Sequence, residues 1–229
     1  MIKRFVFIGC ICFFTLQIIH AQSQDSLALD FHFKFNETPL VIGQEFVSKQ
    51  KDSLKINTFR FYVSDIQLLF ADNSTAQIKE SHLVDLEMPA TQKISLIPNS
   101  KKRVKAVVFS IGVDSLASVS GALSGDLDPT KGMYWAWQSG YINMKIEGQS
   151  PSCKTRKNQF QFHIGGYLEP NNALRTLTFN PKKSNVIEVS IDLAAFFDEV
   201  PLAEVNSVMI PGKRGIQLAD ISTKMFSVE

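Results

Sequence analysis

Apolar and polar residues alternate along residues 27–36, and this period of two constrains the fold more than any other feature. The positions Leu27, Leu29, Phe31, Phe33 and Phe35 are apolar, and the residues between them are mostly polar. Successive side chains of a β-strand point to opposite faces, so the pattern predicts a strand with one buried face. Similar runs, separated by turn residues, recur along the chain. They are residues 59–70, 82–86, 94–97, 104–111, 133–146, 159–164, 174–179 and 186–191.

Many short strands with turn signals between them predict an all-β fold, specifically an antiparallel β-sandwich. One short helix is predicted near the C-terminus, over residues 193–200, with Asp192 as its cap. Residues 112–132 are rich in Ser, Gly and Asp and predict a long irregular loop, and loops of that length are often functional. We predict that residues 22–229 form a single domain. The alternative is two domains divided near residues 112–132.

The N-terminus has the pattern of a secretory signal peptide. Lys3 and Arg4 precede an apolar run over residues 5–19, and Ala21 ends it before a polar segment. A charged start, a short apolar core and a small residue at the cleavage point are typical of such signals. We therefore predict that residues 1–21 are removed and that the mature protein is periplasmic or otherwise exported. The remaining chain has no apolar run of the length that a transmembrane helix needs.

Composition and motifs narrow the functions. The formal net charge of +2 gives no electrostatic reason to expect nucleic-acid binding. No Gly-x-Ser-x-Gly motif or phosphate-cradling glycine loop is present, so we predict that the protein is not an enzyme. Asp126 and Asp128 form a short acidic turn, which is weak evidence for calcium. Cys153 is the one cysteine outside the predicted signal peptide. It is expected to lie in a loop without a role.

Three histidines follow the predicted signal peptide, and two of them interrupt apolar strands. His32 and His163 each lie between two apolar residues, so both are expected on the polar face, where the core does not need them. His82 shares its parity with Val84 and is expected to pack at a strand end. A single histidine in such a position is most simply solvated or hydrogen-bonded. Spacing alone leaves open whether His32 and His163 meet.

Both tryptophans of the protein lie in residues 128–141. In an extended segment Met133, Trp135 and Trp137 would point to one side. On composition alone, the simplest interpretation is that these side chains fill a core or cover a sheet edge.

These segments resemble the MbnP family of periplasmic copper-binding proteins. Residues 127–141 (Leu-Asp-Pro-Thr-Lys-Gly-Met-Tyr-Trp-Ala-Trp-Gln-Ser-Gly-Tyr) with residues 145–148 (Lys-Ile-Glu-Gly) are similar to the central signature of that family. Residues 162–167 (Phe-His-Ile-Gly-Gly-Tyr) are similar to its next motif. Weaker matches follow the same order over nearly the whole mature chain. They are residues 61–66, 109–115, 209–212 and 225–226.

The resemblance implies a β-sandwich that binds a single copper ion, as Cu(I) or Cu(II). It also implies a partner, a diheme peroxidase-like enzyme of the MbnH type, that oxidises a tryptophan to kynurenine. Imidazoles and the resulting amine nitrogen suit copper. Carried over to this sequence, the metal ligands are His32, His163 and either Trp135 or Trp137, with the Met133 thioether as a further donor. His32 and His163 would then lie side by side at one end of the sandwich.

The resemblance is not complete, and a second function stays open. Some relatives carry a four-cysteine motif, which this chain lacks; the difference bears on stability more than on metal binding. The alternative function is an exported interaction or adhesion module, in which the tryptophans serve packing only. The sequence does not tell whether copper would be stored, delivered or sensed.

Overall fold

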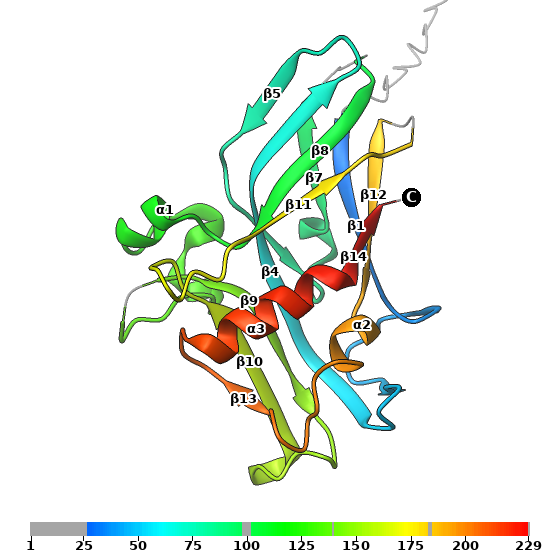
Figure 1. The fold of residues 1–229 in the computed structure, drawn as a ribbon, viewed down its shortest axis with the longest axis vertical. Helices are drawn as coiled ribbons and strands as arrows, with labels where there is room; N and C mark the ends of the chain where they lie inside the picture. Colours follow the sequence, from blue (N-terminus) through cyan, green and yellow to red (C-terminus); the bar gives the residue numbers. More distant parts are fainter. Residues whose placement is uncertain (1–26, 98–101, 139, 183–184, 229) are drawn as a thin grey trace, which may run out of the picture.

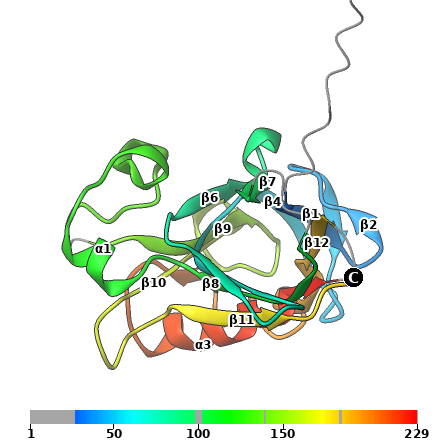
Figure 2. The same cartoon turned by 90° about the horizontal axis from the view of Figure 1, so that it is seen from above.

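The computed structural model describes residues 27–97, 102–138, 140–182 and 185–228. The predicted signal peptide lies outside these residues. Within them, two β-sheets pack face to face (Figures 1 and 2). The small sheet contains β1 (Leu27–Phe35), β2 (Thr38–Pro39), β7 (Lys93–Ile97), β12 (Val186–Asp192) and β14 (Phe226–Val228). The large sheet contains β3 (Glu45–Val47), β4 (Ser53–Phe70), β5 (Thr75–Ile78), β6 (His82–Asp85), β8 (Val104–Ile111), β9 (Ile142–Gln149), β10 (Gln159–Gly165), β11 (Arg175–Phe179) and β13 (Ser207–Val208).

The apolar face of β1 forms one wall of the core between the sheets. The ring of Phe31 meets the rings of Phe61 and Phe109 of the large sheet edge-on, with centroids 5.7 and 6.2 Å apart. Phe33 meets Phe59 in the same way, at 5.5 Å. The alternation over residues 27–36 is therefore confirmed as the inner and outer faces of one strand. Aromatic pairs of this geometry add stability beyond the area that they bury.

The long strand β4 organises the large sheet. It pairs with β8 and β9, and over parts of its length with β3, β5 and β6. In Figure 1 it runs through nearly the full height of the molecule. Register shifts interrupt its pairing with β8 between Ser64 and Gln67 and with β9 between Ile56 and Thr58. Such bulges bend a strand, which lets one strand serve several partners.

The predicted β-sandwich is confirmed, and most of its strand pairs are antiparallel, but two pairs are parallel. β1 pairs with β12 in parallel, and β10 pairs with β13 in parallel. Parallel neighbours require long connections, because the chain must return to the same end of the sheet. Between β1 and β12 the chain forms most strands of the large sheet. The alternation of apolar and polar residues within one strand does not show the direction of the strand that pairs with it.

The helices differ from the prediction in number. The predicted helix over residues 193–200 is found as the short α2 (Ala194–Phe197), and the Asp192 carboxylate accepts a hydrogen bond from the Ala194 amide. A longer helix, α3 (Lys213–Ser222), was not predicted; it buries Leu218, Ala219 and Ser222 on one side and packs on β10. None of the helices in the described residues is long and apolar enough to cross a membrane.

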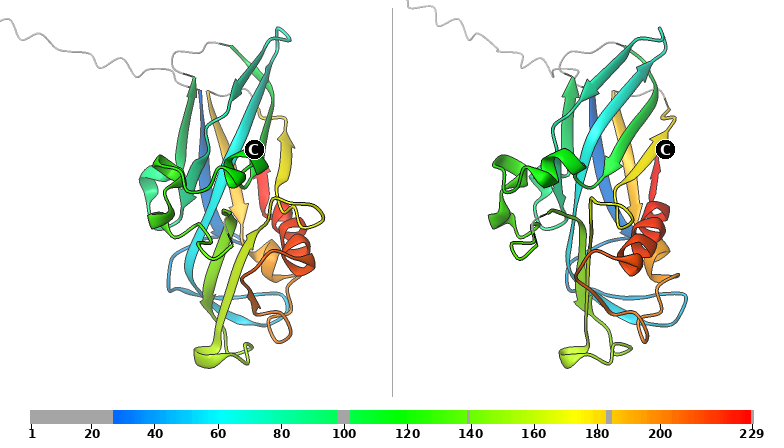
Figure 3. Two further views of the ribbon diagram at one scale, coloured as in Figure 1. Left: turned by 90° about the vertical axis from the view of Figure 1, so that its left-hand side faces the viewer. Right: turned by 60° about the vertical axis from the view of Figure 1, so that its left-hand side comes forward.

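Residues 112–138 together with 140 and 141, here called the cover segment, form a layer on the outside of the large sheet rather than a free loop. The segment includes α1 (Ser115–Val119) and the 3₁₀ turns η2 (Gly125–Leu127) and η3 (Pro129–Lys131). Figure 3 shows α1 and α3 on different sides of the molecule. Apolar side chains of the cover segment and of the strands below it form a second apolar cluster, separate from the main core. Its members are Tyr62, Leu83, Val113, Met133, Trp135, Tyr141 and Ile142.

Cys153 lies in the turn between β9 and β10, as expected, but it has a structural role there. Its side chain is buried as part of the main hydrophobic core. Burial raises the pKa of the thiol to about 11. The residue therefore acts as a small apolar side chain.

Candidate functional site

The outer face of the large sheet carries a row of polar side chains where β4, β9 and β10 lie side by side. Arg60 pairs with Lys145, and Lys145 pairs with His163, so the three side chains share one face. The neighbouring row of Phe59, Ile146 and Phe162 faces the core. Arg60 donates to the carbonyl of Lys131, and Lys145 donates to the carbonyl of Gly132 at 2.5 Å. These bonds fasten the cover segment to the sheet.

His163 is held on this face by Glu147 of the neighbouring strand. The distance from Nε2 of His163 to Oε1 of Glu147 is 2.6 Å, and the His163 side chain is 9% exposed. The hydrogen bond from His163 lowers the pKa of Glu147, and Lys145 adds to this effect. Burial in turn lowers the pKa of Lys145. His163 lies on the outer face of its strand as predicted, but its side chain is buried there and not solvated.

Trp135 lies on the same side of the sheet, against the end of β10. Backbone bonds from the Trp135 amide to the Gly140 carbonyl and from the Ile142 amide to the Met133 carbonyl hold residues 133–135 against residues 140–142. The indole then covers Gly165, where an added Cβ would stand 2.8 Å from Cη2 of Trp135. Trp135 is 5% exposed, and its Nε1 is buried without a hydrogen-bond partner among the described residues. A buried hydrogen-bond donor without an acceptor is rare in folded proteins.

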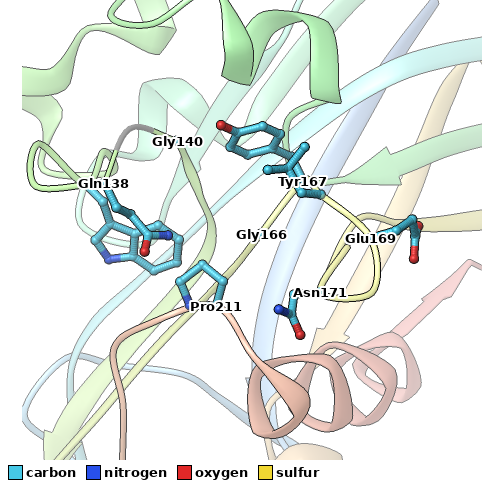
Figure 4. Close-up of a pocket in the computed structure, with 9 residues that line it drawn as sticks. Gln138, Gly140, Gly166, Tyr167, Glu169, Asn171 and Pro211 are labelled. Atoms are coloured by element: carbon cyan, nitrogen blue, oxygen red, sulfur yellow. The ribbon is translucent and has the colours of Figure 1, made fainter.

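A cavity of about 400 Å³ opens beside this indole. Figure 4 shows it between Gln138, Tyr167, Asn171 and Pro211. Trp135 also lines it. It lies at the junction of the cover segment, the loop that follows β10 and the segment before α3. The site therefore has an opening to the surface next to the tryptophan.

Met133 and Trp137 take different places around Trp135. Met133 is completely buried in the second apolar cluster with Trp135. Trp137 is 62% exposed, although its ring centroid is only 6.2 Å from that of Trp135. The segment is not extended as assumed, because the chain turns after Trp135, and Trp137 does not share the buried environment of the other two side chains.

His32 does not belong to this site. Its neighbours Phe31 and Phe33 point into the core from the small sheet, so His32 points outward from that sheet, and its side chain is 57% exposed. His163 points outward from the large sheet. The two imidazoles are thus on opposite outer faces, and packed sheets are about 10 Å apart before the side chains are counted. The prediction that they lie side by side is wrong, because both polar phases face away from the shared core.

His82 begins β6 and pairs with Val63 of β4. Its ring is partly buried, and Nε2 has no hydrogen-bond partner among the described residues. Burial lowers the pKa of His82, and the nearby Asp126 opposes that shift. Asp126 itself accepts bonds from the Leu83 amide and from the Lys131 ammonium group. His82 is therefore a neutral imidazole under the cover segment, at the strand end where the sequence places it.

The site offers nitrogen and sulfur donors rather than a carboxylate cluster. Within the described ranges, no group of three or more His, Cys, Asp and Glu side chains is arranged to hold a metal ion. The donors on this side of the sheet are the imidazole of His163 on β10, the unpartnered indole nitrogen of Trp135 over Gly165, and the Met133 thioether in the same apolar cluster as Trp135. Nitrogen and thioether ligands suit copper. The orphaned nitrogen is the feature that fits a tryptophan-derived ligand, once the indole is opened to an amine.

Two residues of this site were not singled out from the sequence. Glu147 lies in the Lys-Ile-Glu-Gly run, two residues after Lys145, so its place on the outer face follows from the period of the strand. Its contact with His163 depends on the register between β9 and β10, which the sequence does not give. Gly165 similarly follows His163 by two residues, but the indole that covers it comes from a distant loop.

Comparison with known proteins identifies the family and the fold of the chain. The sequence model of the MbnP family matches residues 24–210. Among solved structures, MbnP from Methylosinus trichosporium has the same fold, with a TM-score of 0.62 over 81% of each chain and 15% sequence identity. No curated protein sequence matches this chain. The chain belongs to the MbnP family.

Proposed function

We propose that the protein is an exported copper-binding protein of the bacterial envelope, with a role in copper acquisition or handling. The metal site that we propose is centred on His163 and on an oxidised Trp135. Membership of the MbnP family supports the copper-related role. The observation that carries the choice of residues is the buried, unpartnered Nε1 of Trp135, whose indole covers Gly165 two positions after His163.

An intact Trp135 is a poor ligand, because its indole nitrogen carries a proton and no lone pair in the ring plane. Conversion to kynurenine changes this. The C2–C3 bond of the indole breaks, C2 leaves as formate, and an aromatic amine and a ketone remain. With hydrogen peroxide as oxidant, one tryptophan and two peroxides give one kynurenine, one formate and one water. We assign this reaction to the partner, a diheme enzyme of the MbnH type.

The surroundings of Trp135 suit such a change better than those of Trp137. Leaving a buried donor unpaired costs about 1–3 kcal/mol, and Trp135 carries that cost in the unmodified chain. The cavity of about 400 Å³ beside the ring provides room for the ketone oxygen and an exit for formate. Trp137 is exposed, so its nitrogen has water as a partner. We therefore propose Trp135 as the modified residue and Met133 as an additional soft donor.

Peptide mapping tests this proposal. The mature protein is produced with and without the diheme enzyme, digested, and examined by mass spectrometry together with a copper assay. We expect the kynurenine mass change on Trp135 only in the presence of the enzyme, and one copper per modified chain. A modified Trp137 with an intact Trp135 would contradict the choice of residue. Absence of both modification and copper would favour the adhesion-module alternative, with the tryptophans as packing residues.

A further inference from the structure

The strongest unexplained contact at the site is the bond between His163 and Glu147. Glu147 stands opposite Gln161 in the β9–β10 ladder, whereas His163 stands opposite Lys145. The carboxylate therefore reaches diagonally across the ladder to the imidazole, with 2.6 Å between Oε1 and Nε2. Its side chain is 28% exposed, compared with 9% for His163. The contact is thus largely shielded from water, where a hydrogen bond to a charged group is strong.

The hydrogen-bonding roles of Glu147 and His163 determine which ring nitrogen of a neutral His163 carries the proton. A glutamate at neutral pH is ionised and can only accept hydrogen bonds. A neutral imidazole has one N–H and one lone pair, so a ring that bonds to Glu147 through Nε2 carries its proton there. The lone pair is then on Nδ1. Among the described residues, the hydrogen bond of Nε2 to Glu147 is the one that the His163 ring makes.

We propose that Glu147 is a positioning residue, which holds His163 in the tautomer that presents Nδ1 to the metal. This inference rests on the proposed function. Histidines that bind metals commonly donate their second N–H to a carboxylate, which fixes the ring and raises the basicity of the ligand nitrogen. In this chain the two strands supply that carboxylate from a neighbouring position, before any metal is bound.

A matched control exists on the other sheet. The imidazole of His32 also lies near a carboxylate, with 3.8 Å between Nε2 and Oδ1 of Asp30. That distance is too long for a hydrogen bond, and the His32 side chain is exposed. Removal of the Asp30 carboxylate therefore changes the net charge by the same amount as removal of the Glu147 carboxylate, without touching the proposed site.

The first measurement needs no copper. Selective ¹⁵N labelling of histidine and NMR of the ring nitrogens report the tautomer of His163 at neutral pH. We expect a protonated Nε2 and an unprotonated Nδ1 in the wild-type protein. E147Q should keep this tautomer, because the amide carbonyl still accepts the bond, whereas E147A should lose the preference. A wild-type His163 with its proton on Nδ1 would overturn the inference.

The second measurement is the affinity for Cu(I) of protein made together with the diheme enzyme. We expect E147A to bind about 10–100-fold more weakly, E147Q to lose less, and D30A to bind as the wild type does. Far-UV circular dichroism checks that each variant is folded. If E147A is not folded, the comparison of E147Q with the wild type replaces it. Wild-type affinity of a folded E147A, with loss of binding in H163A, would overturn the inference alone. Unchanged binding in H163A would instead overturn the proposed function.

Discussion

The indole of Trp135 covers the backbone of Gly165 so closely that no other residue fits there. A Cβ at position 165 would stand 2.8 Å from Cη2 and 2.9 Å from Cζ3 of Trp135, and 2.6 Å from the carbonyl oxygen of Tyr141. Real Cβ atoms do not approach heavy atoms so closely, and the Tyr141 carbonyl belongs to the backbone. The end of β10 and the loop of Trp135 must therefore separate if the glycine is replaced.

We expect Gly165→Ala to reduce the free energy of unfolding by about 1–3 kcal/mol, because overpacking forces the backbone to shift. Chemical denaturation measures the loss, and tryptophan fluorescence reports the displaced indole. The control is Gly215→Ala in α3, where the nearest heavy atom to an added Cβ is 3.8 Å away. Alanine favours a helix, so this variant should match the wild type or gain up to about 1 kcal/mol. Equal stability of the two variants would contradict the close contact.

The two tryptophans differ in exposure, at 5% for Trp135 and 62% for Trp137. Each single Trp→Phe variant leaves one fluorescent reporter, since the chain has two tryptophans. We expect acrylamide to quench the fluorescence of Trp135→Phe strongly, because only the exposed Trp137 remains. Trp137→Phe should resist quenching and emit at shorter wavelength. Similar quenching of both variants would contradict the burial of Trp135.

Tyr141 holds the cover segment through its hydroxyl group. The oxygen accepts from the Leu123 amide at 3.0 Å and lies 3.1 and 3.0 Å from the carbonyls of Gly121 and Leu127. Tyr141→Phe leaves that amide without its acceptor, so we expect a loss of about 1–3 kcal/mol and faster hydrogen exchange in residues 121–127. Tyr134→Phe removes a hydroxyl from the neighbouring ring and touches none of these bonds. If both variants exchange alike, the Tyr141 hydroxyl does not anchor the segment.

Burial raises the pKa of the Cys153 thiol to about 11. The thiolate is the reactive form, so at pH 8 the folded protein should react very slowly with a disulfide reagent. Unfolding in guanidinium chloride should expose the thiol and restore fast reaction. Spectrophotometric titration with a chromogenic disulfide compares the two states. Rapid reaction of the native protein would contradict the placement of Cys153 in the core.

Most strands were predictable because one buried face leaves a period of two in the sequence. β8 has the predicted bounds, and β1 differs by a single residue. The predicted strand over residues 133–146 begins only at Ile142, because the apolar residues before it belong to the cover segment and pack on the outer face of the large sheet, not between the sheets. The missed helix α3 has four buried residues spaced for a helix, but three of them are Gly215, Ala219 and Ser222, which carry little apolar signal.

The candidate site was predictable in part, for a different reason. The period of the strand places His163 on an outer face, and the family resemblance brings it together with Trp135. The same period places His32 on an outer face too, but it says nothing about which sheet the strand joins. The two histidines therefore looked equivalent in sequence, although β1 and β10 belong to opposite sheets. Contacts across strands, such as that of Glu147 with His163, depend on register and stay invisible until the fold is known.

Copper titration of two histidine variants tests the central claim most directly. The wild type, His163→Ala and His32→Ala are each produced with the diheme enzyme, and Cu(I) binding is measured by competition with a coloured chelator. His163→Ala should lose the bound copper, because it removes the imidazole that we propose as a ligand. His32→Ala should bind copper as the wild type does, because His32 points to solvent from the other sheet. Copper binding that survives in His163→Ala, or that is lost in His32→Ala, would contradict the account.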